Sequence, residues 1–195
     1  REIESIPVHH RSHIRRVFLA DGDALIYPQQ GLEAILELLA ETFPSLQRVG
    51  AYASPKRLFS KSCEELEMLR EMKLRILYFG LESGDGPTLE AINKGFSPGE
   101  MLDACRKAQD AGMKLSVTAI LGLAGRDRTH EHAKATAEWI NALSPSYFSL
   151  LTLFSRHNDD FLRSIRPLSR GEIFEEAFEM VSFLNHRKTI LRPKH

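Results

Sequence analysis

Cysteine is scarce in this sequence, and the motifs that are missing exclude several classes of protein. The 195 residues contain only Cys63 and Cys105, which form neither a CxxC pair nor a disulfide framework. So few cysteines are typical of a protein from a reducing compartment. No apolar run approaches the roughly 18 residues of a membrane-spanning helix, and no secretory apolar region is present. We therefore expect a cytoplasmic protein without a membrane partner.

Net charge is also absent. Lys and Arg together number 26, as do Asp and Glu, so the formal net charge at pH 7 is zero. A neutral chain gives no electrostatic reason to expect nucleic acid or an anionic membrane as a partner. Hydrophobic residues make up 43% of the chain, which is enough for one core. We predict a single domain over residues 1–195.

Short apolar runs alternate with amphipathic stretches after an irregular lead-in over residues 1–16. The expected strands are residues 17–20, 49–53, 77–84, 114–121 and 147–153. The expected helices are residues 31–43, 87–92 and 169–185, with others beginning at Ser62, Ser97 and about Thr129. A Ser followed three residues later by a Glu starts three of them, which predicts capping boxes. This order predicts a core over about residues 16–153 and a C-terminal helical extension over residues 154–195.

Strands that alternate with helices require parallel pairing through crossover connections. A dinucleotide-binding sheet would carry Gly-x-Gly-x-x-Gly after its first strand, whereas Asp21-Gly22-Asp23 stands there. Moreover, every expected strand ends in polar residues or glycine. These features favour an α/β fold of the partial TIM-like barrel type with parallel strands, in which ligands bind beyond the carboxyl ends of the strands.

Acidic residues at two strand ends are the first candidates for chemistry. Asp21 and Asp23 could hold a divalent metal, bind an amine or simply cap a turn. Glu82 follows a buried strand, where an unpaired carboxylate costs several kcal/mol. A functional role therefore explains Glu82 better than a structural one.

Basic and small residues give weaker signals. Lys94 could bind an anion or be a solvated lysine at a helix end. Gly122 and Gly125 would let the backbone approach a flat ligand, although a helix start also favours such a loop. His130 and His132 lie at a helix start, where residues two apart do not share a face, so we expect no shared metal.

Together these strand ends resemble the core of radical S-adenosylmethionine (SAM) enzymes, in particular the oxygen-independent coproporphyrinogen oxidase and elongator type. The similarity covers about residues 16–153. Its matching segments are residues 21–25, 52–55, 79–84, 93–95 and 120–125. Each segment is loosely defined, but five in this order make a specific pattern.

The resemblance implies a SAM site at the strand ends. The residues after the first strand would receive the SAM amino group, and Ser54 and Glu82 would contact the ribose and methionine parts. Lys94 would bind the carboxylate, and the residues after the fourth strand would pack against adenine. The cofactor-binding residues implied in this way are Gly22, Asp23, Ser54, Glu82, Ser83, Lys94, Leu121, Gly122 and Leu123.

The resemblance also implies a [4Fe-4S] cluster held by a CxxxCxxC motif, which this sequence lacks. Cys63 and Cys105 do not replace it. Because the chain begins with Arg1, we expect the motif upstream of residue 1. Such an enzyme, supplied by an electron donor, would cleave SAM reductively to a 5′-deoxyadenosyl radical that acts on an unidentified substrate.

Two other functions stay open. A metal-dependent TIM-barrel hydrolase or lyase would use Asp21, Asp23 and Glu82 as oxygen ligands for a divalent cation. A non-catalytic SAM-binding module would keep the SAM site without the cluster.

Overall fold

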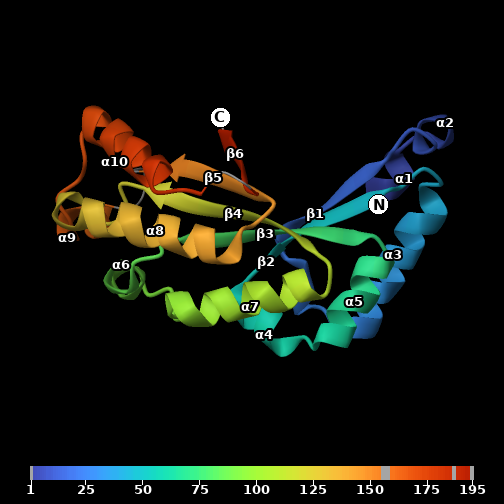
Figure 1. Ribbon diagram of the computed structural model, residues 1–195. Helices are drawn as coiled ribbons and strands as arrows, with labels where there is room; N and C mark the ends of the chain where they lie inside the picture. Colours follow the sequence, from blue (N-terminus) through green and yellow to red (C-terminus); the bar gives the residue numbers. More distant parts are fainter. Residues whose placement is uncertain (1, 155–158, 186–187, 194–195) are drawn as a thin grey trace. The chain divides into compact units, whose positions relative to one another are not determined.

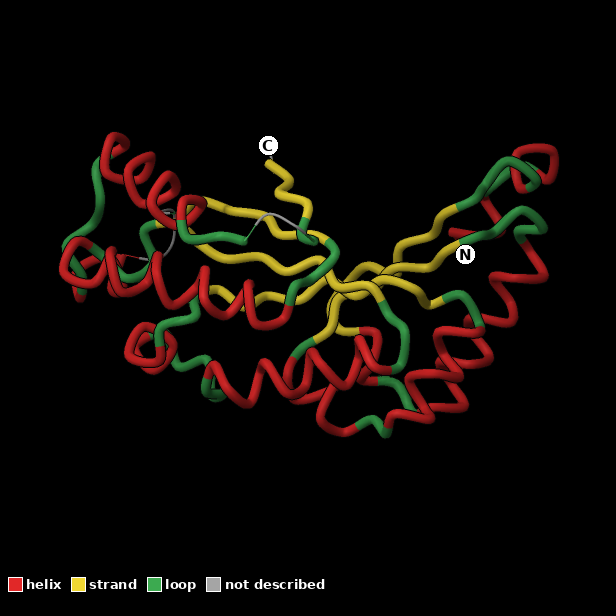
Figure 2. The backbone as a smooth tube through the Cα atoms, viewed as in Figure 1, coloured by secondary structure: helices red, strands yellow, loops and turns green. Residues whose placement is uncertain are grey.

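The computed structural model describes residues 2–154, 159–185 and 188–193. Within them, helices alternate with parallel strands, as Figure 1 and Figure 2 show, and the predicted α/β class is confirmed. The strands are β1 (Arg16–Asp23), β2 (Arg48–Ala53), β3 (Leu74–Glu82), β4 (Lys114–Leu121), β5 (Tyr147–Thr152) and β6 (Ile190–Pro193). The α-helices are α1 (Glu2–Ser5), α2 (Val8–Arg11), α3 (Gln29–Thr42), α4 (Pro55–Ser60), α5 (Cys63–Glu71), α6 (Gly86–Ala91), α7 (Pro98–Asp110), α8 (Thr129–Leu143), α9 (Asp159–Ser164) and α10 (Arg170–Ser182). Short 3-10 helices are η1 (Ala24–Ile26) and η2 (Arg126–Arg128).

The chain divides into two compact units. Unit 1 comprises residues 1–79 and 104–115, and unit 2 comprises residues 80–103 and 116–195. The single domain expected from the sequence stays a prediction. Among the described residues, no helix combines the length and the apolar character that crossing a membrane requires. The cytoplasmic location likewise stays a prediction.

Unit 1 is built around β2, which pairs in parallel with β1 on one side and with β3 on the other. The β1–β2 ladder begins with Arg16 opposite Arg48, and its register shifts between Leu19 and Asp23. Helix α3 packs against α5 (Figure 1), and both carry fully buried leucines. The register shift acts as a bulge and re-aims the chain where β1 ends in polar residues.

Unit 2 is built around β5, which pairs in parallel with β4 and with β6. Buried side chains lie on both faces of β4, as expected for a parallel strand with both faces covered. Helix α8 packs along α10. The small residues Ala133 and Ala137 are fully buried on α8, so neighbouring elements can approach this helix closely.

Most of the predicted boundaries are confirmed. Strand β4 covers residues 114–121, and α8 begins at Thr129. Complete capping boxes precede α5 at Ser62 and α10 at Ser169. Ser97 and Glu100 also exchange hydrogen bonds at the start of α7. These signals could be found because each depends on residues that are close in the sequence.

Three stretches differ from the prediction. Residues expected to form an irregular lead-in contain the one-turn helices α1 and α2, which are too short to show a helical period. Helix α4 directly follows β2, where the pattern suggests only a strand end. The C-terminal extension contains the helix expected from Ser169, as α10, but also α9, for which no separate helix was predicted, and β6, whose four residues pair with β5. Residues 155–158, 186–187 and 194–195, which belong to the predicted C-terminal helical extension, lie outside the described residues.

Gly84 joins the loop after β3 to α8 without room for a side chain. Its N–H donates to Thr136 Oγ1 at 2.9 Å. A Cβ at Gly84 would lie 2.4 Å from the carbonyl oxygen of Ala135 and 2.6 Å from Thr136 Cα. Both are backbone atoms, which cannot rotate away from the added carbon. This glycine therefore lets the strand end rest directly on α8.

We predict that Gly84→Ala lowers the free energy of unfolding by about 1–3 kcal/mol or more, because the added carbon forces the backbones apart. Gly86→Ala is the matched control, since a Cβ there meets nothing within 4 Å. It should change the free energy of unfolding by about 0.5 kcal/mol or less. Urea denaturation of both variants measures the difference, and equal effects would contradict the packing described here.

Candidate functional site

The carboxylate of Asp23 accepts two backbone hydrogen bonds at the ends of β1 and β2. Oδ1 accepts from the Leu25 N–H at 3.0 Å, which starts η1, and Oδ2 accepts from the Ser54 N–H at 2.8 Å. About two of the four lone-pair positions of the carboxylate therefore remain for a ligand. A cavity of about 660 Å³ borders Gly22 and Asp23. The structure thus brings together the predicted residues Asp23 and Ser54.

Lys94 and Glu82 form an ion pair at the end of β3. The ammonium of Lys94 donates to Glu82 Oε1 at 3.1 Å and to the Gly80 carbonyl oxygen at 2.7 Å. The two side chains are only 19% and 24% exposed. An ammonium has three donors, so one remains, and within the described ranges Glu82 Oε2 has no hydrogen-bond partner. The pair therefore offers one donor and one acceptor to a ligand.

The backbone next to this pair adopts a conformation that non-glycine residues rarely take. Glu82 has φ +64° and Asn93 has φ +53°, both in the left-handed region. Gly80 accommodates the arrangement, because a Cβ there would lie 2.3 Å from Glu82 Oε1. A strained residue of this kind costs about 1–3 kcal/mol and persists only where its surroundings fix it. The strain at Glu82 points to a functional constraint.

Ser83, the next residue, is fully buried, and its hydroxyl has protein partners. Its Oγ lies 2.7 Å from His132 Nδ1 and accepts from the Asp85 N–H at 2.9 Å. Direct contact between Ser83 and a cofactor stays a prediction. Burial lowers the pKa of His132 to about 4, although the nearby charge of Asp85 raises it, so the ring is neutral at pH 7. His130 lies 2.5 Å from Glu179 instead, so the two histidines contact different groups.

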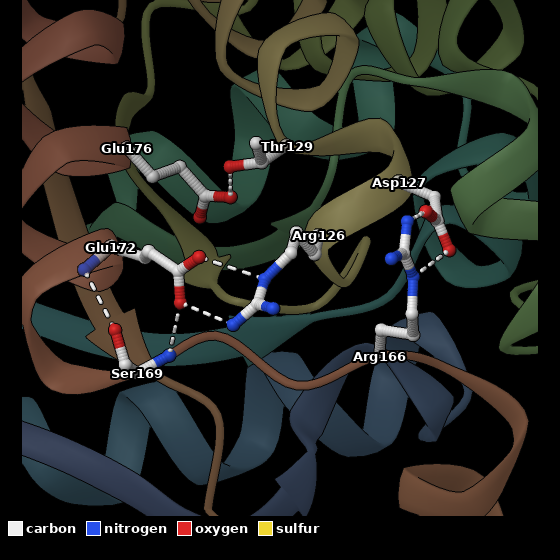
Figure 3. A network of polar contacts seen from close by, with 7 residues as sticks. All are labelled: Arg126, Asp127, Thr129, Arg166, Ser169, Glu172 and Glu176. Carbon is white, nitrogen blue, oxygen red and sulfur yellow. Dashed lines mark hydrogen bonds and ion pairs between the residues drawn. The ribbon is translucent and has the colours of Figure 1, made fainter.

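The end of β4 and the turn after it are buried. The predicted site residues there are Leu121, Gly122 and Leu123. Gly122, with φ +79°, donates its N–H to Glu176 Oε1 at 2.7 Å. The other carboxylate oxygen of Glu176 accepts from the Thr129 hydroxyl (Figure 3). Burial raises the pKa of Glu176, while these two hydrogen bonds oppose the rise. Glu176, on α10, thus fixes the turn after β4.

Exposed ion pairs surround this buried contact (Figure 3). Glu172 accepts from Arg126 at 2.7 Å and from the Ser169 N–H, also at 2.7 Å. The backbone hydrogen bond from Ser169 contributes most to lowering the pKa of Glu172 to about 2, and Arg126 adds to it. Arg166 pairs with Asp127. Exposed pairs contribute only about 0–1 kcal/mol each, so Glu176 is the main tether.

Asp85 holds the other side of the same turn. Arg128 donates to both of its carboxylate oxygens, at 2.8 and 3.0 Å, and Asp85 caps α6 by accepting from the Thr88 N–H. Burial raises the pKa of Asp85, but the bonds from Arg128 and Thr88 outweigh it and hold the pKa below the usual value. The Asp-x-x-Thr spacing is a local signal of this cap. No sequence signal identifies Glu176, whose partner Gly122 is 54 residues away.

The predicted cofactor-binding residues fall into two groups. Unit 1 contains Gly22, Asp23 and Ser54, and unit 2 contains Glu82, Ser83, Lys94, Leu121, Gly122 and Leu123. The side chain of Asp21, named for the metal alternative, lies outside the described part of the chain. Among the described side chains, no group of three His, Cys, Asp or Glu residues could hold a metal ion.

The sequence is similar to a known protein family and to curated proteins. A family model described as the radical SAM superfamily matches residues 1–140. An uncharacterized methyltransferase of Pyrococcus horikoshii is 23% identical over 148 residues, which are 75% of this chain and 31% of that protein. The chain spans about a third of the length of the curated relatives that it matches.

Solved structures of similar fold agree with this match. Coproporphyrinogen III oxidase from Escherichia coli, described as a radical SAM enzyme, has a TM-score of 0.70 at 16% identity, over 90% of this chain and 42% of that chain. Elp3 of the archaeon Methanocaldococcus infernus has a TM-score of 0.68 at 14% identity, and the match covers 91% of this chain and 46% of the Elp3 chain. These likenesses confirm the predicted TIM-like barrel class of α/β fold.

We predict that Glu82→Gly has a free energy of unfolding about 1 kcal/mol higher than that of Glu82→Ala. Both variants lose the ion pair with Lys94, but only glycine adopts φ +64° without strain. Glu138, exposed within α8, provides the matched control, because there glycine should be less stable than alanine by about 1 kcal/mol. Denaturant unfolding of the four variants tests this. An alanine variant at position 82 as stable as the glycine variant would show that no strain is stored there.

The buried His132 should make the protein acid-sensitive. Its pKa is about 4 in the folded state and about 6.5 in the unfolded chain, so between these values only the unfolded chain takes up a proton. Stability should therefore fall by up to about 3 kcal/mol as the pH falls from about 6.5 to 4. The raised pKa of Glu176 acts in the opposite direction, since its stability contribution is lost as pH rises.

The difference between the wild-type and His132→Asn profiles of unfolding free energy against pH isolates the histidine contribution. The variant should lose this acid slope, whereas His130→Asn, on the same helix, should keep it. If the unfolding free energies of the wild type and His132→Asn changed with pH in parallel, this would contradict a neutral, buried His132 in the folded state.

Proposed function

Because the chain belongs to the radical SAM superfamily, we propose that it forms the SAM-binding part of a radical SAM enzyme. The superfamily uses SAM and a [4Fe-4S] cluster, and the structural neighbours include enzymes such as coproporphyrinogen III oxidase. When SAM is bound beside a reduced cluster it supplies radical chemistry, and the protein binds, orients and shelters it. An electron donor is part of this proposal, and the substrate is unidentified.

The ion pair between Lys94 and Glu82 is the observation that carries the proposal. SAM ends in an amino acid group, with one ammonium and one carboxylate. The donor left on Lys94 suits the carboxylate, and the acceptor left on Glu82 suits an ammonium or a hydroxyl. The pair is pre-organised, because the Gly80 carbonyl holds Lys94 and the left-handed backbone fixes Glu82. Little ordering would then be needed when the ligand binds.

We propose further SAM contacts at the other strand ends, each taken within its own unit. Asp23, held by two backbone N–H groups, would accept from the SAM amino group, with Gly22 beside it. Ser54, at the start of α4, would contact the ribose. The turn at Gly122, fixed by Glu176, would present backbone and apolar side chains to the adenine.

The two cysteines of this chain do not suit the cluster. Burial raises the pKa of Cys105, and burial together with Glu67 and Glu64 raises that of Cys63. Both effects disfavour the thiolate that binds iron. A three-cysteine motif is also absent from the sequence. In this proposal the cluster ligands come from elsewhere in the full-length protein.

The alternatives make different predictions. A divalent-metal hydrolase or lyase would bind its cation through Asp21, Asp23 and Glu82, but Glu82 is paired with Lys94, whose positive charge opposes a cation there. A non-catalytic SAM-binding module makes the same binding prediction as the proposed enzyme. The two differ in whether the full-length protein carries iron and cleaves SAM.

We predict that Lys94→Met weakens SAM binding to the full-length protein at least about tenfold, equivalent to about 1.4 kcal/mol. Glu82→Ala should have an effect of similar size, because each change removes one half of the ion pair. Isothermal titration calorimetry under anaerobic conditions measures both. Lys134→Met, an exposed lysine on α8, is the control and should bind SAM like the wild type. Unchanged affinity in both site variants would refute the site assignment.

A second experiment decides between the radical SAM enzyme and the non-catalytic binding module. It measures the iron and acid-labile sulfide content of the full-length protein after reconstitution without oxygen. We expect about four of each per chain, as one [4Fe-4S] cluster requires. SAM cleavage should then follow on reduction. SAM binding without iron and sulfide would identify a non-catalytic module and overturn the enzymatic proposal.

A further inference from the structure

Five basic side chains line one cavity in unit 1, which we call the basic cavity. Its volume is about 400 Å³. The lining residues are Arg16, Gln47, Arg48, Arg70, Arg75, Gly112 and Lys114. No Asp or Glu is among them, although the whole chain has equal numbers of acidic and basic residues. Positive charge is therefore concentrated here by the fold.

The fold gathers these cations from the amino-terminal ends of the strands. Arg16, Arg48 and Lys114 are the first residues of β1, β2 and β4, and Arg75 is the second residue of β3. Arg70 lies in the last turn of α5. Asp23 and Ser54 belong to the opposite, carboxyl ends of β1 and β2. The basic cavity is thus distinct from the proposed SAM contacts in this unit.

Like charges lie close together in this cavity, which is open to solvent, since Arg16, Arg70, Arg75 and Lys114 are exposed. Arg16 and Arg48 are direct neighbours in the β1–β2 ladder, and like charges at such positions repel. In the described part of the chain, none of the five basic side chains has an ion pair or hydrogen bond to a protein group. The negative end of the α5 dipole offsets part of this repulsion, but only next to Arg70. A bound anion would relieve the rest.

The turn after α7 shapes the cavity wall around Arg70. Gly112 has φ +78°, and a Cβ there would lie 3.2 Å from Arg70 Nε. The glycine therefore lets the guanidinium lie directly over the backbone. Lys114 follows two residues later, so one short segment shapes two of the five cationic positions.

The composition of the lining indicates the ligand. Four of the five cations are arginines, whose planar forks bind phosphate oxygens in pairs. The lining contains no aromatic residue on which a base could stack, as single-stranded nucleic acid binding requires. The neutral chain also lacks the extended positive field that attracts long nucleic acids. These features favour a compact ligand with several adjacent phosphates.

We propose that the basic cavity binds a polyphosphate group, either free or as the phosphate chain of a nucleoside triphosphate. This site is independent of the SAM site and of the radical chemistry. The arginines at the strand starts bind the phosphates, and the ligand neutralises charges that otherwise repel each other.

Calorimetric titration of the full-length protein with inorganic tripolyphosphate tests the proposal. We expect saturable binding at about 0.1 M salt, where exposed long-range charge effects are already screened. The double variant Arg16→Gln/Arg48→Gln should bind at least tenfold more weakly. It should also have a higher melting temperature than the wild type in the absence of ligand, because the repulsion is removed. A purely structural role for these arginines would lower the melting temperature.

Three further variants and two further ligands complete the test. Arg170→Gln, at the start of α10, removes one exposed arginine outside the cavity and should bind tripolyphosphate like the wild type. Arg48→Lys keeps the charge but loses the planar guanidinium. This variant and Arg75→Gln should each weaken tripolyphosphate binding less than the double variant does. They replace the double variant in the test if that variant does not fold.

ATP binding identifies the source of the phosphates. Tighter binding of ATP than of tripolyphosphate would identify a nucleotide as the ligand, and equal binding would identify a free polyphosphate. The proposal is overturned by the absence of saturable binding, by affinity that does not depend on Arg48 and Arg75, or by tighter binding of a 12-nucleotide single strand.

Discussion

The carboxyl ends of parallel strands meet at one edge of a sheet and their amino ends at the other, and much of the polar chemistry of this protein follows from that constraint. Within β2, Val49 and Ala51 are fully buried, and the first polar group beyond its carboxyl end is Ser54. Strand β1 ends at Asp23, and β3 ends at Glu82. The amino ends carry arginine and lysine instead. Strands β1, β2 and β3 thus each separate two chemically different edges, one with acidic or hydroxyl groups and one with cations.

Buried polar groups in unit 2 are tolerated because each is hydrogen-bonded or neutral. Asp85 keeps its charge because Arg128 and Thr88 donate to it. Glu176 accepts from the Gly122 N–H and the Thr129 hydroxyl, although burial raises its pKa. Burial lowers the pKa of His132, which is neutral. The nearest polar atoms of His132 and Glu176, Nε2 and Oε1, are 3.8 Å apart, and Nε2 has no hydrogen-bond partner in the described residues. An unpaired neutral nitrogen costs less in the interior than an unpaired charge.

Prediction from sequence succeeded where the signal is local. The capping boxes at Ser62 and Ser169 and the bounds of β4 depend on residues near one another in the chain. Of the residues predicted to bind SAM, Asp23 and Ser54 are joined by a hydrogen bond, and Glu82 and Lys94 by an ion pair. Their role in binding SAM stays a prediction.

What could not be predicted depends on distant residues or on backbone geometry. Glu176 reaches Gly122 only because α10 packs on α8, and β6 exists only through its pairing with β5. The left-handed backbone at Glu82 has no signature in residue type, since glutamate rarely adopts it. The hydroxyl of Ser83 was assigned to the cofactor by position, whereas its partners in the fold, His132 and the Asp85 N–H, are contacts that follow from burial.

The close approach of Gly80 to the Glu82 carboxylate has an evolutionary consequence. Because a Cβ at Gly80 would lie 2.3 Å from Glu82 Oε1, a side chain there moves the flexible carboxylate out of its place beside Lys94. The cost of a substitution at position 80 therefore falls on the ion pair. Descendants of this sequence that keep the ion pair should tend to inherit the glycine with it.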